Sequence, residues 1–223
     1  MDTLTNVDNR RSGNLTPSAR INTCTVSSKN ISGVSVENAI NENVCWFVLR
    51  VSYHREQKAY KWLTSQGIET YLPFHFVKKE VDGKLRRVQE SLLPNLIFVN
   101  TQFSKIDALI RSATNTLLSF YYNHFEFTPD GKNPPLIVPT CQMDNFIRLT
   151  SIDNDHILFV SPDKCHYKSG DEVIVTDGPF KGVKGRIARV QRQQRVVVEI
   201  DGIGCVTTAY VPSGFITHNN YSF

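Results

Sequence analysis

Hydrophobic and polar positions divide the 223-residue chain into three regions. The first 43 residues contain 19 Ser, Thr or Asn and no aromatic residue. Such a segment cannot bury enough apolar surface to offset the conformational entropy that is lost on folding. The pattern therefore predicts a largely disordered polar tail over residues 1–43. A loosely docked arm is the alternative, since Ile31, Val34 and Val36 could pack against the rest of the chain.

The apolar pattern changes abruptly at residue 44. Val44 to Val51 is β-branched and aromatic, which is typical of a buried strand. The following segment, from His54 to Gln66, has apolar residues on one side and Gly67 just past its end. This combination predicts an amphipathic helix that packs against the strand.

The next segment predicts a hairpin, because Asp82-Gly83 is the favoured pair for a two-residue turn. It lies between a strand-like run from Ile68 to Lys79 and another that ends at Leu92 to Val99. The remaining elements expected are helices near 104–112 and 140–150 and a strand near 117–122. Their order predicts an α+β domain over residues 44–150, with a mostly antiparallel sheet flanked by helices.

The last third of the chain has a different pattern of apolar and turn-forming residues. Residues 151–168 are predicted to be a linker. Short strand-like runs then recur at about ten-residue spacing, separated by turns rich in Gly and Pro, which is typical of a small all-β barrel. We expect this barrel over residues 169–218.

Charge narrows the search for a binding surface. The formal net charge is +4, and the whole excess falls in residues 44–99, which carry nine Lys or Arg and five Asp or Glu. A polyanion contact is therefore expected there first. Arg55, Lys58 and Lys61 recur every three residues on the predicted first helix, although an ordinary solvated helix face would look the same. The hairpin carries a second basic patch, which could contact DNA or protect an exposed hairpin from aggregation: Lys78, Lys79, Lys84, Arg86 and Arg87.

Catalytic and metal-binding patterns are missing from the sequence. It contains no nucleophile elbow, no phosphate-binding glycine loop leading into a helix, and no His-Glu-x-x-His. The five cysteines lie at scattered spacings, which suggests reduced thiols and not a metal site. No apolar run approaches the roughly 20 residues that cross a bilayer, and the N-terminus lacks the apolar core of a secretory signal. These features predict a cytoplasmic binding protein without cofactor, metal or membrane contact, and not an enzyme.

Two motifs then point to a family. The segment from Gly170 to Arg186, GDEVIVTDGPFKGVKGR, resembles the KOW motif, and Phe180 and Lys181 lie in its loop. Phe180 could contact a partner or close one end of the barrel. Trp46-Phe-Val-Leu and Leu92-Leu-Pro-Asn-Leu-Ile-Phe-Val resemble the NGN domain of NusG-type transcription factors. An NGN domain, a linker and a KOW domain in this order is that family's architecture. Within the family, the segment from Arg195 to Pro212 is similar to UpxY antiterminators of capsular polysaccharide operons, and Leu-Pro-Asn is similar to RfaH.

The resemblance implies a role for individual residues. Val48, Leu96 and Phe98 match the apolar depression that binds the β′ clamp helices of RNA polymerase. Alternation puts Leu96 and Phe98 on one face of their strand, but does not say which face fills the core. The matching nucleic-acid contacts, to the non-template DNA strand, are Tyr53, His54, Arg55, Lys58 and Lys61.

Other implied contacts concern the second half of the chain. Residues near Ile106 to Arg111 correspond roughly to the segment that meets the β gate loop, although the family's motif is not reproduced there. Phe180 and Lys181 match the loop that binds a ribosomal protein or Rho. The Val-rich runs of the last third favour a stable barrel that does not refold as helices.

The function expected from this resemblance is operon-specific antitermination. A housekeeping NusG-type factor and a KOW-containing RNA-binding module of ribosome assembly or translation are the alternatives.

Overall fold

The computed structural model describes residues 43–112, 117–124, 126–127, 131–152, 157–160, 165–190 and 192–218. The predicted polar tail, apart from Asn43, lies outside these residues. The predicted α+β fold class is confirmed: a mixed α/β unit is followed by an all-β region, and all strand pairs that the structure describes are antiparallel.

The first unit is built on a sheet in the order β2-β5-β1-β6, with β7 also paired to β1. Its central strand β1 is apolar on both sides because helices cover both faces of the sheet. The strands are β1 (Val44–Val51), β2 (Glu69–Tyr71), β5 (Leu96–Gln102), β6 (Leu118–Phe120) and β7 (Ile137–Val138).

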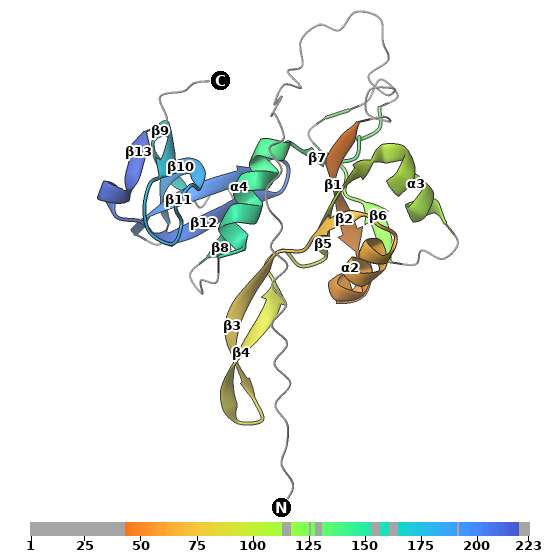
Figure 1. The fold of residues 1–223 in the computed structure, drawn as a ribbon, viewed down its shortest axis with the longest axis horizontal. Helices are drawn as coiled ribbons and strands as arrows, with labels where there is room; N and C mark the ends of the chain where they lie inside the picture. Colours follow the sequence, from red (N-terminus) through yellow and green to blue (C-terminus); the bar gives the residue numbers. More distant parts are fainter. Residues whose placement is uncertain are drawn as a thin grey trace, which may run out of the picture.

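Helices lie on opposite faces of this sheet (Figure 1). α2 (Glu56–Ser65) and α3 (Phe103–Arg111) cover one face, and α4 (Thr140–Thr150) covers the other. The last of these spans the same residues as the predicted helix. None of the helices that the structure describes is long and apolar enough to cross a membrane.

A long hairpin leaves the sheet as a separate two-stranded ribbon (Figure 1). It consists of β3 (Phe74–Val81) and β4 (Lys84–Ser91), and its predicted Asp-Gly turn is confirmed, with φ of 53° at Asp82 and 71° at Gly83. Each of the two strand-like runs that flank this turn is divided into two strands, β2 and β3 before the turn and β4 and β5 after it. The breaks fall at Pro73 and Pro94, which lack the N–H that a sheet ladder requires.

The C-terminal β region (residues 158–218) is a six-stranded sheet in the order β13-β9-β10-β11-β12-β8. It begins inside the predicted linker, because the short apolar run of β8 pairs with Cys205–Thr207 of β12. The strands are β8 (Leu158–Val160), β9 (His166–Val175), β10 (Lys184–Val190), β11 (Gln193–Ile200), β12 (Gly204–Tyr210) and β13 (Ile216–His218), with the 3-10 turn η3 (Ser213–Phe215) before the last.

A glycine in β10 allows a close approach between two of these strands. A Cβ on Gly185 would lie 2.3 Å from the backbone oxygen of Val197 and 3.0 Å from Val196 Cγ1. We expect Gly185→Ala to lower the free energy of unfolding by about 1–3 kcal/mol, since β11 must shift to admit the methyl group. Chemical denaturation measures this loss.

Gly214 provides the matched control, because a Cβ there meets no atom within 4 Å. Gly214→Ala is expected to change stability by less than about 0.5 kcal/mol. Equal stability of the two variants would contradict the close packing of β10 on β11.

Candidate functional site

The structure resolves which face of β5 fills the core beneath the paired helices. Ile97 and Val99 are fully buried in the cluster that includes Ala59 and Leu63 of α2 and Ile106 of α3. The neighbouring residues, Leu96 and Phe98, lie on the opposite face of the strand. That face belongs to a second cluster, which includes α4 and part of the C-terminal β region.

A row of side chains crosses three strands on the second face. Val48 of β1 pairs with Phe98 of β5, which in turn pairs with Tyr71 of β2. Phe146 of α4 packs on this row, with its ring centroid 5.3 Å from that of Phe98 and 5.9 Å from that of Tyr71. Val48 and Phe98 are fully buried, whereas Leu96 and Tyr71 are partly exposed.

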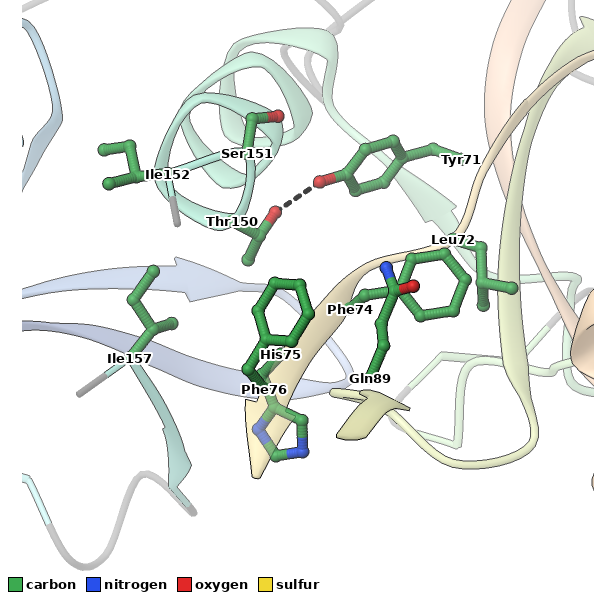
Figure 2. A pocket seen from close by; sticks show the side chains of 10 residues that line it. All are labelled: Tyr71, Leu72, Phe74, His75, Phe76, Gln89, Thr150, Ser151, Ile152 and Ile157. Atoms are coloured by element: carbon green, nitrogen blue, oxygen red, sulfur yellow. Dashed lines mark hydrogen bonds between the residues drawn. The ribbon is translucent and has the colours of Figure 1, made fainter. Parts of the chain in front are cut away.

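A cavity of about 260 Å³ opens at the Tyr71 end of the row (Figure 2). Its wall combines the base of the hairpin with the end of α4 and is mainly apolar. The lining residues are Tyr71, Leu72, Phe74, His75, Phe76, Gln89, Thr150, Ser151, Ile152 and Ile157.

The Tyr71 hydroxyl ties the cavity wall together. It lies 2.5 Å from Thr150 Oγ1, which also hydrogen-bonds to the Phe146 carbonyl at 2.7 Å (Figure 2 shows the first of these bonds). Burial raises the pKa of Tyr71 further above neutral, and the protonated phenol can donate to Thr150. β2 and α4 are therefore joined at the cavity by a hydrogen bond as well as by ring packing.

The predicted nucleic-acid residues begin in a strained turn. Tyr53 and His54 have φ of 61° and 51°, in the left-handed backbone region that residues other than glycine rarely adopt. They form η1 (Ser52–His54), so the helix starts at Glu56 and not at the predicted His54. The turn projects both side chains outwards, with Tyr53 79% exposed and the His54 side chain 75% exposed.

Buried Glu56 holds this turn in place. Its Oε1 accepts a hydrogen bond of 2.7 Å from the backbone N–H of Asn95, and the Asn95 carbonyl accepts one of 2.8 Å from Val51. A hydrogen bond to a charged group contributes about 1.5–3 kcal/mol, which is comparable to the roughly 1–3 kcal/mol of one strained residue. One buried carboxylate thus offsets a large part of the strain in the turn.

The predicted basic residues of α2 lie next to the turn. Arg55, Lys58 and Lys61 are all exposed, and the Arg55 guanidinium lies 5.6 Å from the centroid of the Tyr53 ring. All five predicted nucleic-acid residues are therefore exposed, on the turn before α2 and along the first two turns of the helix. This surface lies on the face of the sheet opposite Val48 and Phe98.

The predicted KOW-loop residues lie close to α4. Phe180 is 3% exposed and belongs to the same cluster as Phe146, whereas Lys181 is exposed. The loops on either side contact the helix, because Gln142 exchanges two hydrogen bonds with Asp201, and Asn145 Oδ1 accepts one from the Lys184 N–H. Phe180 is thus closed to a partner while the C-terminal β region rests on α4.

The segment that the resemblance relates to the gate-loop contact forms α3. Ile106 is fully buried under the sheet, and Arg111 pairs with Asp107 at 2.8 Å within the helix. Ile106 therefore supports the core and leaves only the outer side of this helix to a partner.

Two protein-family models match the chain. Residues 44–147 match the family model described as transcription termination factor nusG, and residues 169–199 match the KOW motif. The chain therefore contains a NusG-type domain followed by a KOW motif. NusG-type domains are those of non-enzymatic transcription factors.

A distant likeness to a solved structure accompanies these matches. A solved structure concerning domain interaction in Thermotoga maritima NusG has 19% sequence identity and a TM-score of 0.35, and the match covers 75% of this chain and 94% of that one. No curated protein sequence matches the chain.

Sequence reasoning missed the residues that shape the NusG-type site around the predicted ones. The sequence indicates only strands at Tyr71, Phe74 and Phe76. These residues line the cavity together with Thr150, which lies 79 residues after Tyr71 in the sequence. The charge pattern of the predicted helix does not single out Glu56, which is an acid among cations. Its position one turn before Ala59 and two turns before Leu63 could have marked it as part of the buried side.

We expect Glu56→Ala to release the strained turn. The variant should lose about 1–3 kcal/mol of unfolding free energy, since it leaves the Asn95 N–H without its carboxylate acceptor. Denaturation curves measure the loss, and faster hydrogen exchange of the Asn95 amide would locate it.

Gln57→Ala, at the exposed neighbouring position, is the control and should change neither quantity. If both variants behaved like the wild type, Glu56 would not be what holds the turn.

Proposed function

We propose that this NusG-type protein binds RNA polymerase during elongation and reduces pausing and termination. The observation that carries the proposal is the match to the NusG and KOW models in that order along the chain. We further propose that it acts on one class of operon, a surface polysaccharide gene cluster. The similarity of the segment from Arg195 to Pro212 to the UpxY group supports this specialisation.

The cavity beside Tyr71 is the proposed docking site for the β′ clamp helices. Val48 and Phe98 are fully buried, so they would form the floor beneath the site and shape it from below. Leu96 and the cavity wall supply the partly exposed apolar surface. Burial of such surface contributes roughly 25 cal/mol per Å², which suits the docking of an apolar helix pair.

The strained turn and α2 are proposed to contact the non-template DNA strand. Tyr53 and His54 are exposed rings that can stack on unpaired bases, while Arg55, Lys58 and Lys61 can neutralise phosphates. Because this surface and the cavity lie on opposite faces of one sheet, the protein could hold polymerase and DNA at the same time.

The proposed partner contact of the KOW loop, to a ribosomal protein or Rho, requires release from α4. Phe180 is buried in the docked arrangement, and the hydrogen bonds of Gln142 and Asn145 oppose its exposure. We propose that the loop becomes available when the C-terminal β region separates from the helix. Lys181, which is already exposed, would then lie beside the freed ring.

The function is tested by transcription in vitro from the protein's own operon leader. We expect fewer pauses and more terminator read-through with the protein than without it, together with co-purification of polymerase. Lys58→Gln/Lys61→Gln should reduce the effect and lower the slope of log affinity for single-stranded DNA against log salt by about 1.4, since each phosphate contact contributes about 0.7.

The charge-matched control is Arg189→Gln/Arg192→Gln, at two exposed positions of the C-terminal β region. It should leave read-through and the salt slope unchanged. Unchanged pausing and no polymerase binding would overturn the proposal, and co-sedimentation with ribosomes alone would favour a translation role. Association with polymerase on all genes would favour a housekeeping factor.

Release of the C-terminal β region is tested by hydrogen exchange. Gln142→Ala/Asn145→Ala removes the side-chain hydrogen bonds to Asp201 and Lys184, each contributing about 0.5–1.5 kcal/mol. Amides of residues 178–184 should therefore exchange about tenfold faster than in the wild type. Gln57→Ala is the control on a remote helix, and equal exchange in all three proteins would refute this account of docking.

A further inference from the structure

The β3–β4 hairpin carries an unusual arrangement of charge. In the register of the ribbon, Lys78 lies directly opposite Arg87, and Lys79 lies directly opposite Arg86. Like charges at directly opposed positions destabilise a strand pair. A two-stranded ribbon is itself only marginally stable, so two adjacent repulsive pairs work against its folding.

These four cations surround the middle of the ribbon. Successive residues of a strand point to opposite faces, so Lys78 and Arg87 lie on one face and Lys79 and Arg86 on the other. All four are exposed. Figure 1 shows the ribbon extending away from the sheet and from the C-terminal β region, which leaves both faces accessible.

Two further contacts hold part of this cation belt, Lys78, Lys79, Arg86 and Arg87, in position. The Arg87 guanidinium stacks 3.9 Å from the centroid of the Phe76 ring, and Lys79 forms an ion pair with Glu90. A stacked guanidinium still presents its N–H edge to an anion. The belt is therefore partly ordered before any partner binds.

Protection of the exposed ribbon edges from aggregation does not explain why like charges lie opposite each other. Charges of either sign prevent edge-to-edge association, and opposed pairs of opposite sign would do so while stabilising the ribbon. Cations on both faces at one level instead fit a partner that presents negative charge to both faces.

We propose that the β3–β4 hairpin is a second DNA-binding element, which enters the major groove of double-stranded B-form DNA and contacts phosphates on both walls. The major groove of B-DNA admits a two-stranded β-ribbon, whereas that of A-form RNA is too deep and narrow. Eight-residue strands make a ribbon about 25 Å long, which places the cation belt well clear of the body. This contact involves surfaces other than the cavity and the turn, and it requires no polymerase.

The test uses the full chain and a labelled 30-base-pair DNA duplex of arbitrary sequence, without polymerase. Lys78→Gln/Arg86→Gln removes one cation from each opposed pair and keeps the Arg87–Phe76 and Lys79–Glu90 contacts. Fluorescence anisotropy should show duplex affinity falling about tenfold or more near 0.1 M salt, with a shallower salt dependence. The melting temperature should stay the same or rise, because both repulsions are relieved.

Arg189→Gln/Arg192→Gln removes the same charge elsewhere and should leave duplex affinity within about threefold of wild type. An equal loss in this control, or no loss in the hairpin variant, would overturn the proposal. A lower melting temperature of the hairpin variant would contradict the role of the opposed charges.

Competition with other nucleic acids tests the class of partner. Duplex RNA of the same sequence should compete at least about tenfold less well than DNA, and equal competition would refute insertion into the major groove. Single-stranded DNA should bind the hairpin variant as it binds the wild type. Equal loss for single and double strands would refute a duplex-specific element.

Discussion

Helix α4 holds the two halves of the molecule together, because Phe146 packs on Phe98 of the first sheet while Gln142 and Asn145 hydrogen-bond to the C-terminal β region. Complete burial of a large apolar side chain contributes roughly 1.5–3 kcal/mol, and α4 buries Met143, Phe146 and Leu149 completely. The same short helix covers one face of the first sheet and supports the loops of the C-terminal β region. Without it, the row from Val48 to Tyr71 would be an open apolar surface.

This constraint explains why the proposed polymerase site lies where it does. The buried part of the row is rigid, because it is packed on both sides. Its end at Tyr71 opens into a cavity, where β2, the hairpin and the end of α4 meet. The helices α2 and α3 seal the other face of the sheet, so that face offers a partner only the polar outer surfaces of its helices. The sheet thus separates the proposed apolar contact from the proposed electrostatic one.

Local signals predicted much of this fold, and contacts distant in sequence explain what they missed. Residues 140–150 form a helix and Asp82-Gly83 forms a turn because each depends on neighbouring residues alone. The polar stripe of α4, Gln142 and Asn145, looks solvent-facing in the sequence, yet it contacts residues 39 and 59 positions away. The pairing of β8 with β12 and the cavity at Tyr71 are long-range in the same way. The placement of the predicted site residues follows the same division. The exposed turn and helix α2 adjoin one another in sequence, whereas Phe98 is covered by Phe146 of α4, which is distant in sequence.

Two features break the local rules of folding. Tyr53 and His54 occupy strained backbone positions at an exposed turn, and cations oppose each other across an exposed ribbon. A sequence selected for folding alone would place glycine or asparagine in the turn and opposite charges in the ribbon. Departures of this kind are expected where binding, and not stability, sets the residue. Both lie at ends of the NusG-type unit that α4 leaves uncovered, one after β1 and one beyond the break at Pro73. Helix α4 stabilises the centre of the molecule but does not cover the strained turn or the β3–β4 hairpin. Both therefore lie at the edges of the molecule, where a nucleic acid can reach them.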